Sequence, residues 1–440
     1  MPTPGEVYPV ILAWVQALDG PAPPHATAAL AQLLTALLLS QSLRPSALMR
    51  ALLSPVPVPA RQRYRRVARA WSRPWLTAAW LTPRLVRGAL ALVPGTERLL
   101  ALDSVRCGRW EVFVVGLVWH GRVLPLGWAV LPYPWPPGQF TPTVCALLEQ
   151  VAAAWPRGAP PPHLLADRAF PSRAFFQTLA RLGWGWTVRL RACNTLQIAG
   201  QPQPLRERIA QSAPTSWSTV AAQYGVGRGG VPATLVVGRG LPLLPRHQRG
   251  PASLAARQHQ ARQRDHDVAS KARRAARQGA PPTDRWLVLF TTHAHWRPAV
   301  TAYRRRWAIE GTFRDGQGGW DGRHGWDLEP TLAQAAGATQ VAAIVGLWAL
   351  GTLVQCWLGD QVGARTAPAT VQGVVREWTT TGRLSVWARG QFAWHDHSGA
   401  LQAWRLETLA QGAARVAAAP PLTGTTRHRS PPVTMTQHAA

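Results

Sequence analysis

The chain has 440 residues, 48 of them Lys or Arg and 20 Asp or Glu, so its formal net charge is +28. A surplus of this size favours a polyanionic partner, with nucleic acid ahead of a membrane surface or an acidic protein. The hydrophobic fraction of 47% excludes wholesale disorder, and four scattered cysteines with no CxxC pair argue against a zinc ribbon or a disulfide scaffold.

The first 95 residues are rich in helix-forming residues and in arginine. Residues 25–53 predict helix, with a new turn beginning at Arg44-Pro45. Residues 61–87 contain eight arginines, no acidic residue and interleaved aromatic residues. Such a run is either the solvated face of an amphipathic helix or a surface that contacts DNA phosphates, and the charge of the whole chain favours DNA. The expected DNA contacts in this run are Arg61, Arg63, Arg65 and Arg66.

The period of the hydrophobic pattern changes near residue 97. The expected elements are strands at 97–105, 109–120 and 122–133, a helix at 141–155, a strand at 163–167, a helix at 172–183 and a strand at 184–191. Thr141 and Ser172 are the expected N-caps of the two helices. Three antiparallel strands followed by parallel ones through helical crossovers predict an α/β fold, a mixed sheet flanked by helices.

Residues 193–283 interrupt this rhythm with short strand-like pieces, Pro-rich turns and a basic polar helix near 252–278, which predicts a β-containing insertion domain. A strand at 284–293 and a helix at 299–315 then resume the pattern. The expected division of the chain is a helical N-terminal region at 1–95, a catalytic core at 96–192 and 284–360, an insertion domain at 193–283, a C-terminal region at 361–415 and a disordered tail at 416–440.

One uncharged segment, residues 332–358, is long enough to test as a membrane span. Several Gln and Thr residues interrupt it, and neither an aromatic belt nor a second span accompanies it. We therefore expect a buried core helix, no membrane partner and a cytoplasmic protein.

Two carboxylates stand out because each ends an apolar run. Asp103 closes LLALD and Asp167 closes HLLAD, so we expect both at strand ends, where sheet proteins commonly present their sites. A buried carboxylate without a partner is costly, which implies a metal ion or a salt bridge at each position.

Glu310 is the third candidate carboxylate. At about 100° per residue, Tyr303, Arg306, Glu310 and Gln317 fall within roughly 60° of each other on one predicted helix face. The alternative is an ordinary i, i+4 ion pair between Arg306 and Glu310 on a solvated helix.

The neighbours of Glu310 bear on that choice. Trp307, Ile309 and Phe313 are expected to be buried, which a solvated helix leaves unexplained. Three carboxylates suit two Mg²⁺ ions, which prefer oxygen ligands and support phosphodiester chemistry. Arg306 is then positioned to hold the scissile phosphate.

These motifs carry a resemblance to a known family. LALDSV, LLADRAFPS with GWTVRLRACN, and YRRRWAIEGTFRDGQGGW resemble the insertion-sequence transposases of the IS-four group, which have the Tyr-Arg-Glu-Lys signature and an Asp-Asp-Glu (DDE) triad. The resemblance covers about residues 97–192 and 284–330. It implies a ribonuclease-H-like core with Asp103, Asp167 and Glu310 as catalytic residues and metal ligands.

The resemblance also implies an activity and its partners. These are cut-and-paste transposition with Mg²⁺, for which Mn²⁺ can substitute, on double-stranded DNA that comprises the terminal inverted repeats and the target. A homodimer in the DNA complex and a bacterial, nucleoid-associated location follow from it.

The signature is matched by Tyr303, Arg306 and Glu310 but not at its last position, where Gln317 replaces the usual Lys. Gln can hydrogen-bond DNA but brings no charge, and Arg314 or Arg323 is expected to compensate. Two alternatives stay open: a non-catalytic or decayed DNA-binding protein with the same fold, and a ribonuclease-H-like nuclease that acts on RNA hybrids or junctions.

Overall fold

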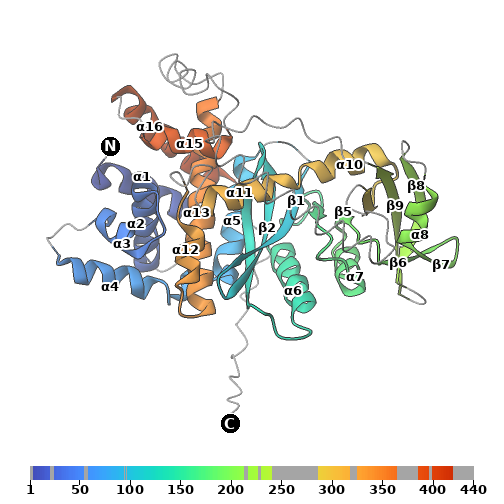
Figure 1. Cartoon of the computed structure of the whole chain (residues 1–440). Helices are drawn as coiled ribbons and strands as arrows, with labels where there is room; N and C mark the ends of the chain where they lie inside the picture. The colour runs from blue at the N-terminus through green and yellow to red at the C-terminus, as the bar shows by residue number, and fades with distance from the viewer. Residues whose placement is uncertain are drawn as a thin grey trace, which may run out of the picture.

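The fold rests on a computed structural model. It describes residues 3–19, 24–53, 58–93, 95, 97–212, 217–225, 229–239, 286–317, 325–363, 385–395 and 399–419. The molecule is elongated, with the N-terminal helices at one end, the sheet in the middle and the last strands of the sheet at the other end (Figure 1).

The N-terminal region is helical, as predicted. Its elements are α1 (Pro4–Asp19), α2 (Pro24–Ser40), α3 (Pro45–Ala51), α4 (Ala60–Ala70), the 3₁₀ turn η1 (Pro74–Leu76) and α5 (Ala78–Leu92). Helix α3 begins at Pro45 with Arg44 as its N-cap, which confirms the predicted turn. Proline suits the first helical position because its missing N–H has no partner to lose there.

Ten strands form one sheet in the order β3-β2-β1-β4-β5-β10-β9-β8-β6-β7. The strands are β1 (Leu99–Cys107), β2 (Trp110–Trp119), β3 (Arg122–Pro132), β4 (His163–Ala166), β5 (Gly185–Arg189), β6 (Thr195–Ile198), β7 (Gln201–Pro204), β8 (Ser218–Tyr224), β9 (Val231–Arg239) and β10 (Trp286–Thr291). The first three are antiparallel, whereas β1–β4 and β4–β5 are parallel. This order confirms the predicted ribonuclease-H-like mixed sheet.

The register of β1 against β4 sets the geometry of the site. Leu102 lies opposite Ala166 in the parallel pair. Asp103 and Asp167 are therefore the next residues of two neighbouring strands, and they lie at the same level of the sheet.

Strands β6 to β9 fall within the predicted insertion, and they continue the central sheet. Strand β9 pairs with β10, and β10 pairs with β5. The described part of this segment also includes α8 (Leu205–Gln211). The basic helix that we predicted near 252–278 lies outside the described residues.

Two helices connect the central strands, α6 (Phe140–Ala153) and α7 (Arg173–Arg181). Ser172 accepts a hydrogen bond from the backbone N–H of Phe175 and is the predicted N-cap of α7. The prediction of Thr141 as N-cap is wrong, because α6 begins at Phe140 with Gln139 as its N-cap. Pro142 then lies in the first turn, where a helix needs no backbone donor.

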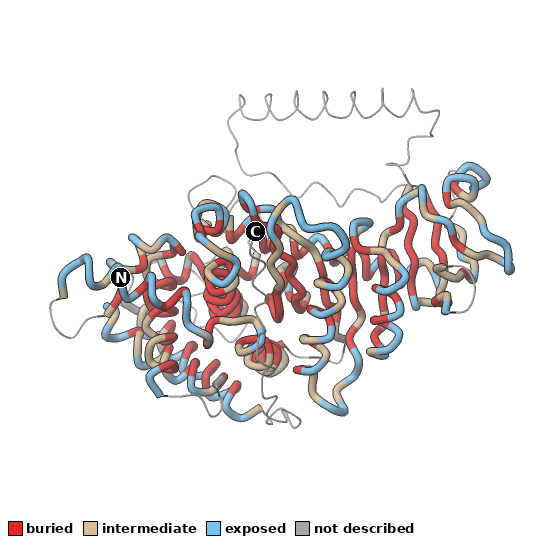
Figure 2. Tube along the Cα trace, turned by 90° about the horizontal axis from the view of Figure 1, so that it is seen from below, coloured by how far each residue is buried: buried red, intermediate tan, exposed pale blue. Residues whose placement is uncertain are grey.

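The remaining helices are α10 (Trp296–Arg304), α11 (Trp307–Gln317), α12 (Leu328–Ala333), α13 (Ala338–Gly363), α15 (Val386–His395) and α16 (Gly399–Ala418). Helix α13 is long and apolar enough to cross a membrane, but 94% of its most apolar window is buried inside the protein. Figure 2 shows the buried residues, in red, gathered along the inner helices and strands. The burial of α13 agrees with the predicted core helix.

The C-terminal boundary differs from the expected one. Helix α16 extends to Ala418, past residue 416, where we placed the start of a disordered tail. Its buried residues, among them Leu409 and Val416, explain this because they join the hydrophobic core. Residues 420–440 lie outside the described ranges.

A half-buried histidine at the start of β4 predicts that the stability of the fold is sensitive to acid. His163 Nε2 lies 2.8 Å from Thr187 Oγ1, and its ring stacks on His293 at 4.4 Å between centroids. Burial, with a contribution from His293, lowers the pKa of His163 to about 3, from 6.5. Below pH 6.5 the unfolded chain therefore binds a proton that the folded chain does not.

We expect stability to fall as the pH drops below 6.5, by up to about 1.4 kcal/mol per pH unit from this residue. Urea unfolding between pH 7 and pH 4 measures the effect. The His163→Gln variant should show a weaker pH dependence than the parent chain. Equal dependence in the two proteins would exclude His163 as the titrating group.

Candidate active site

The two aspartates reach the site from adjacent strands. Asp167 directly follows β4, as predicted. The prediction that Asp103 ends its strand is wrong, because β1 continues to Cys107. Residues 104–107 remain paired with β2, with Cys107 opposite Trp110, so the hairpin extends the strand beyond the carboxylate.

The Tyr-Arg-Glu segment is not one continuous helix, so the predicted single helix face is wrong. Helix α10 ends at Arg304 and α11 begins at Trp307 (Figure 1). At the junction the backbone N–H of Arg306 donates to Tyr303 O, and that of Ile309 donates to Arg306 O. These i to i−3 bonds tighten the chain into a turn, and Arg306 lies in it.

Arg306 bridges two of the three candidate carboxylates. Its Nη1 donates to Asp103 Oδ2 and its Nη2 donates to Glu310 Oε1, both at 2.8 Å. Its side chain is only 4% exposed. The alternative of a solvated Arg306–Glu310 ion pair therefore fails: the pair exists, but its arginine is buried and is shared with a strand.

Tyr303 connects the third carboxylate to the same group. Its hydroxyl donates to Asp167 Oδ1 at 3.1 Å, and the Arg306 guanidinium lies 5.7 Å from its ring centroid. Residues from β1, the end of β4, α10 and α11 thus surround one buried guanidinium.

The pKa values follow from this arrangement. Burial raises the pKa of Asp103 to about 6, with Glu310 and Asp167 adding to the rise and Arg306 opposing it. Burial also acts to raise the pKa of Asp167, but Arg306, the Arg168 N–H, Arg189 and Tyr303 together hold it below the usual value. Burial raises the pKa of the Tyr303 hydroxyl, so it stays protonated and donates. The charge of Arg306 therefore offsets part of the cost of burying both aspartates.

We tested whether these side chains suit a divalent cation. Carboxylate oxygens are the donors that Mg²⁺ and Mn²⁺ prefer, and Asp103 and Glu310 each bond the same guanidinium at 2.8 Å. Within the described ranges, however, no three His, Cys, Asp or Glu side chains lie close enough to hold a metal ion. The chemistry of the donors suits a divalent cation, but in this arrangement the guanidinium of Arg306 bridges two of them, Asp103 and Glu310.

The other predicted contacts near the site lie on α11. Gln317 is its last residue and is partly buried, and Arg314 is exposed one turn before it. Arg323 lies outside the described residues, as do Gly318 and Gly319.

The side chain of Trp307, the first residue of α11, is 43% exposed. Our expectation that Trp307 is buried was wrong, because the turn at Arg306 redirects the first residue of α11 toward solvent.

Sequence reasoning missed Arg189, which helps to lower the pKa of Asp167 from the neighbouring strand β5. An arginine inside the otherwise apolar run WGWTVRLR was the available signal.

The basic run near the N-terminus forms α4, whose arginines face outward. Arg61, Arg65 and Arg66 are exposed and Arg63 is partly so. Of the aromatic residues in that run, Tyr64 is exposed, whereas Trp71 and Trp75 belong to the core. Helix α4 therefore presents an arginine-rich surface with one exposed aromatic ring.

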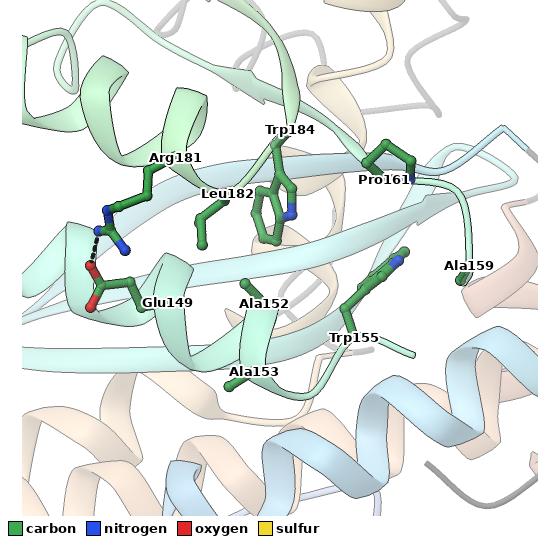
Figure 3. Close-up of a pocket in the computed structure, with 9 residues that line it drawn as sticks. All are labelled: Glu149, Ala152, Ala153, Trp155, Ala159, Pro161, Arg181, Leu182 and Trp184. Carbon is green, nitrogen blue, oxygen red and sulfur yellow. Dashed lines mark hydrogen bonds and ion pairs between the residues drawn. The ribbon is translucent and has the colours of Figure 1, made fainter. Parts of the chain in front are cut away.

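A shallow cavity of about 570 Å³ lies elsewhere, between α6 and α7 (Figure 3). Trp155 and Trp184 line it, and an ion pair of Arg181 with Glu149 lies at its side. None of the three candidate carboxylates lines this cavity, so its position does not indicate the chemistry of the site.

Comparison with known proteins adds one family match. A family model described as a DDE superfamily endonuclease matches residues 140–229, a segment that includes Asp167 but neither Asp103 nor Glu310. No curated protein matches the chain.

Among solved structures, the chain is similar to a cryo-EM structure of a piggyBac transposase synaptic complex with hairpin DNA. The match has 10% identity and a TM-score of 0.36, and it covers 92% of this chain and 82% of that one. This score is too low to assign a fold, which is defined here by the strand order.

We expect removal of the Arg306 charge to destabilise the protein, and we expect an added metal cation to offset part of that loss. The Arg306→Gln variant leaves Asp103 and Glu310 without a counterion, which should cost about 3–5 kcal/mol at pH 7. Urea unfolding measures the loss. Added Mn²⁺ should raise the Tm of this variant more than that of the parent chain, because the carboxylates then bind the ion without competition from the guanidinium.

Arg305→Gln is the matched control. Arg305 pairs with Glu97 on the surface at 2.9 Å, with half of its side chain exposed. Loss of that pair should cost about 0–1 kcal/mol. If the two variants lose the same stability, Arg306 does not neutralise the site.

Proposed function

We propose that this chain is a DDE transposase that cleaves DNA strands and joins them to a target in a metal-dependent reaction. The observation that carries the proposal is the contact of Asp103 and Glu310 with one buried arginine, Arg306, beside which Tyr303 bonds Asp167. The family match over residues 140–229 supports the same assignment.

Asp103, Asp167 and Glu310 are the residues that would hold Mg²⁺, or Mn²⁺ in its place. Bound metal supplies activation of the attacking oxygen and stabilisation of the leaving oxygen. A requirement for several metal ligands would explain why three carboxylates lie near one another in this part of the fold.

Arg306 and Tyr303 orient the DNA strand in this proposal. The buried Nε of Arg306 has no hydrogen-bond partner within the described part of the chain. A phosphate oxygen would satisfy it with a charge-assisted bond. Gln317 and Arg314, toward the end of α11, extend the contact along the same strand.

DNA is the partner that the charge of +28 favours. The proposed substrates are the terminal inverted repeats of an insertion sequence and a target duplex, which a homodimer holds together. The exposed arginines of α4 would bind the backbone of the transposon end. The proposed location is the bacterial cytoplasm, at the nucleoid.

One observation favours a second function. Gln317 replaces the lysine of the signature, and a chain that has lost this cation could survive as a non-catalytic DNA-binding protein with the same fold. The decisive difference is whether the purified chain cuts DNA.

Replacement of Glu310 tests the proposed reaction. With Mg²⁺ and a duplex that carries the inverted repeats flanking the gene, the parent chain should nick the DNA at the repeat end. Glu310→Gln removes a metal ligand but keeps the shape, so cleavage should fall to the level seen without metal. Binding of the same duplex, measured by fluorescence anisotropy, should change little. A parent chain that binds without cutting would favour the second function.

Helix α4 generates a separate prediction about salt. Each neutralised phosphate releases condensed counterions, so log K for DNA binding falls linearly with log salt concentration. Changing Arg61, Arg63, Arg65 and Arg66 together to Gln should reduce that slope by a few units. An unchanged slope would show that α4 is a solvated basic face without DNA contact.

A further inference from the structure

Helix α11, which carries Glu310, contacts the first residues of β3 through its other faces. These contacts are the Arg122–Asp315 ion pair and the hydrogen bonds of Thr312 with Val123. We propose that Arg122 and Asp315 are positioning residues, which set where the Glu310 carboxylate lies relative to Asp103 and so determine the affinity of the site for a divalent cation. This inference rests on the proposed function, because it assigns the metal to the same carboxylates.

The ion pair joins residues that are 193 positions apart in the chain. Arg122 contacts both carboxylate oxygens of Asp315, Nε with Oδ2 and Nη2 with Oδ1, the latter at 3.3 Å. Both side chains are largely buried, at 22% and 11% exposed. A bidentate arginine–carboxylate pair constrains orientation as well as distance.

Thr312 adds a second attachment nearly one turn away from Asp315. Its Oγ1 accepts the backbone N–H of Val123 at 2.7 Å. Both Thr312 and Asp315 therefore contact the first residues of β3. Two attachments to one short backbone segment fix the rotation of α11 about its axis as well as its position.

Gly311 shows how closely the arginine approaches α11. A Cβ atom at this position would lie 2.9 Å from Arg122 Nη1, which is closer than real contacts allow. At about 100° per residue, positions 311, 312 and 315 lie roughly 100–200° around the helix from Glu310. The attachments therefore occupy the side of α11 away from Glu310, whose carboxylate faces Arg306.

The turn that precedes Arg122 is held in place by its own contact with another helix. His120 and Gly121 have φ values of 45° and 75°, as in a tight two-residue hairpin turn. His120 Nε2 lies 3.2 Å from Asp360 Oδ1 on α13, the central helix. A chain of contacts thus runs from α13 through the turn and Arg122 to α11 and Glu310.

Manganese affinity without DNA tests this role. We would titrate the full-length chain with Mn²⁺ and follow free Mn²⁺ by electron paramagnetic resonance. Outer partners that orient metal ligands typically contribute roughly 10–100-fold to metal affinity. Arg122→Gln and Asp315→Asn should each weaken Mn²⁺ binding by about that factor, with DNA binding unchanged.

A positioning role and a purely structural role predict different results. The double variant Arg122→Gln/Asp315→Asn replaces the ion pair with two amides that can bond each other. If the pair positions Glu310, this variant should recover most of the lost Mn²⁺ affinity. Loss of stability without loss of Mn²⁺ affinity, measured well below the Tm, would overturn the proposal. If either single variant does not fold, Thr312→Val removes one hydroxyl only, and unaltered Mn²⁺ affinity in that folded variant would overturn it as well.

Two further variants separate the possible failures. Arg181→Gln breaks the ion pair with Glu149 between α6 and α7, and it should leave Mn²⁺ affinity unaltered. Glu310→Gln should weaken it strongly. If Glu310→Gln has no effect, the proposed metal site fails. If Glu310→Gln weakens binding but the Arg122 and Asp315 variants do not, only the positioning role fails.

Discussion

The site depends on the neutralisation of two half-buried carboxylates by the buried guanidinium of Arg306. Asp103 comes from the middle of β1 and Glu310 from the first turn of α11, yet both bond the same side chain at 2.8 Å. Carboxylates brought this close repel each other and lose hydration, so a cation is required for the arrangement to be stable. Arg306 supplies that cation in this structure, and its charge opposes the rise that burial causes in the pKa of Asp103.

Two structural features bring the carboxylates together. Parallel pairing of β1 with β4 places Asp103 beside Asp167, and the break between α10 and α11 points Arg306 inward while Tyr303 reaches Asp167. A group of carboxylates inside a chain of net charge +28 is the distribution that suits chemistry on a phosphate backbone, for which basic surfaces bind DNA and carboxylates bind metal.

Much of the sheet was predictable because its signals are local. Segments such as RWEVFVVGLVWH are short apolar runs, rich in β-branched and aromatic residues and bounded by turns, and they formed strands in the expected order. The α10–α11 break was not predictable in this way, since residues 303–307 (YRRRW) contain neither Gly nor Pro. The pair of Arg122 with Asp315 depends on a contact across the fold, which no local pattern encodes. The exposure of Trp307 was missed because it follows from that unpredicted break.

The most direct test of the account is the position of a bound metal. A crystal of the full chain soaked in Mn²⁺, measured for anomalous scattering, reports each ion and its ligands. The account predicts Mn²⁺ coordinated by Asp103, Asp167 and Glu310, with two ions about 3.5–4 Å apart once DNA is bound, and with the guanidinium of Arg306 moved from between Asp103 and Glu310. Absence of Mn²⁺ from these carboxylates at saturating concentration, with Arg306 still bridging them, would contradict it.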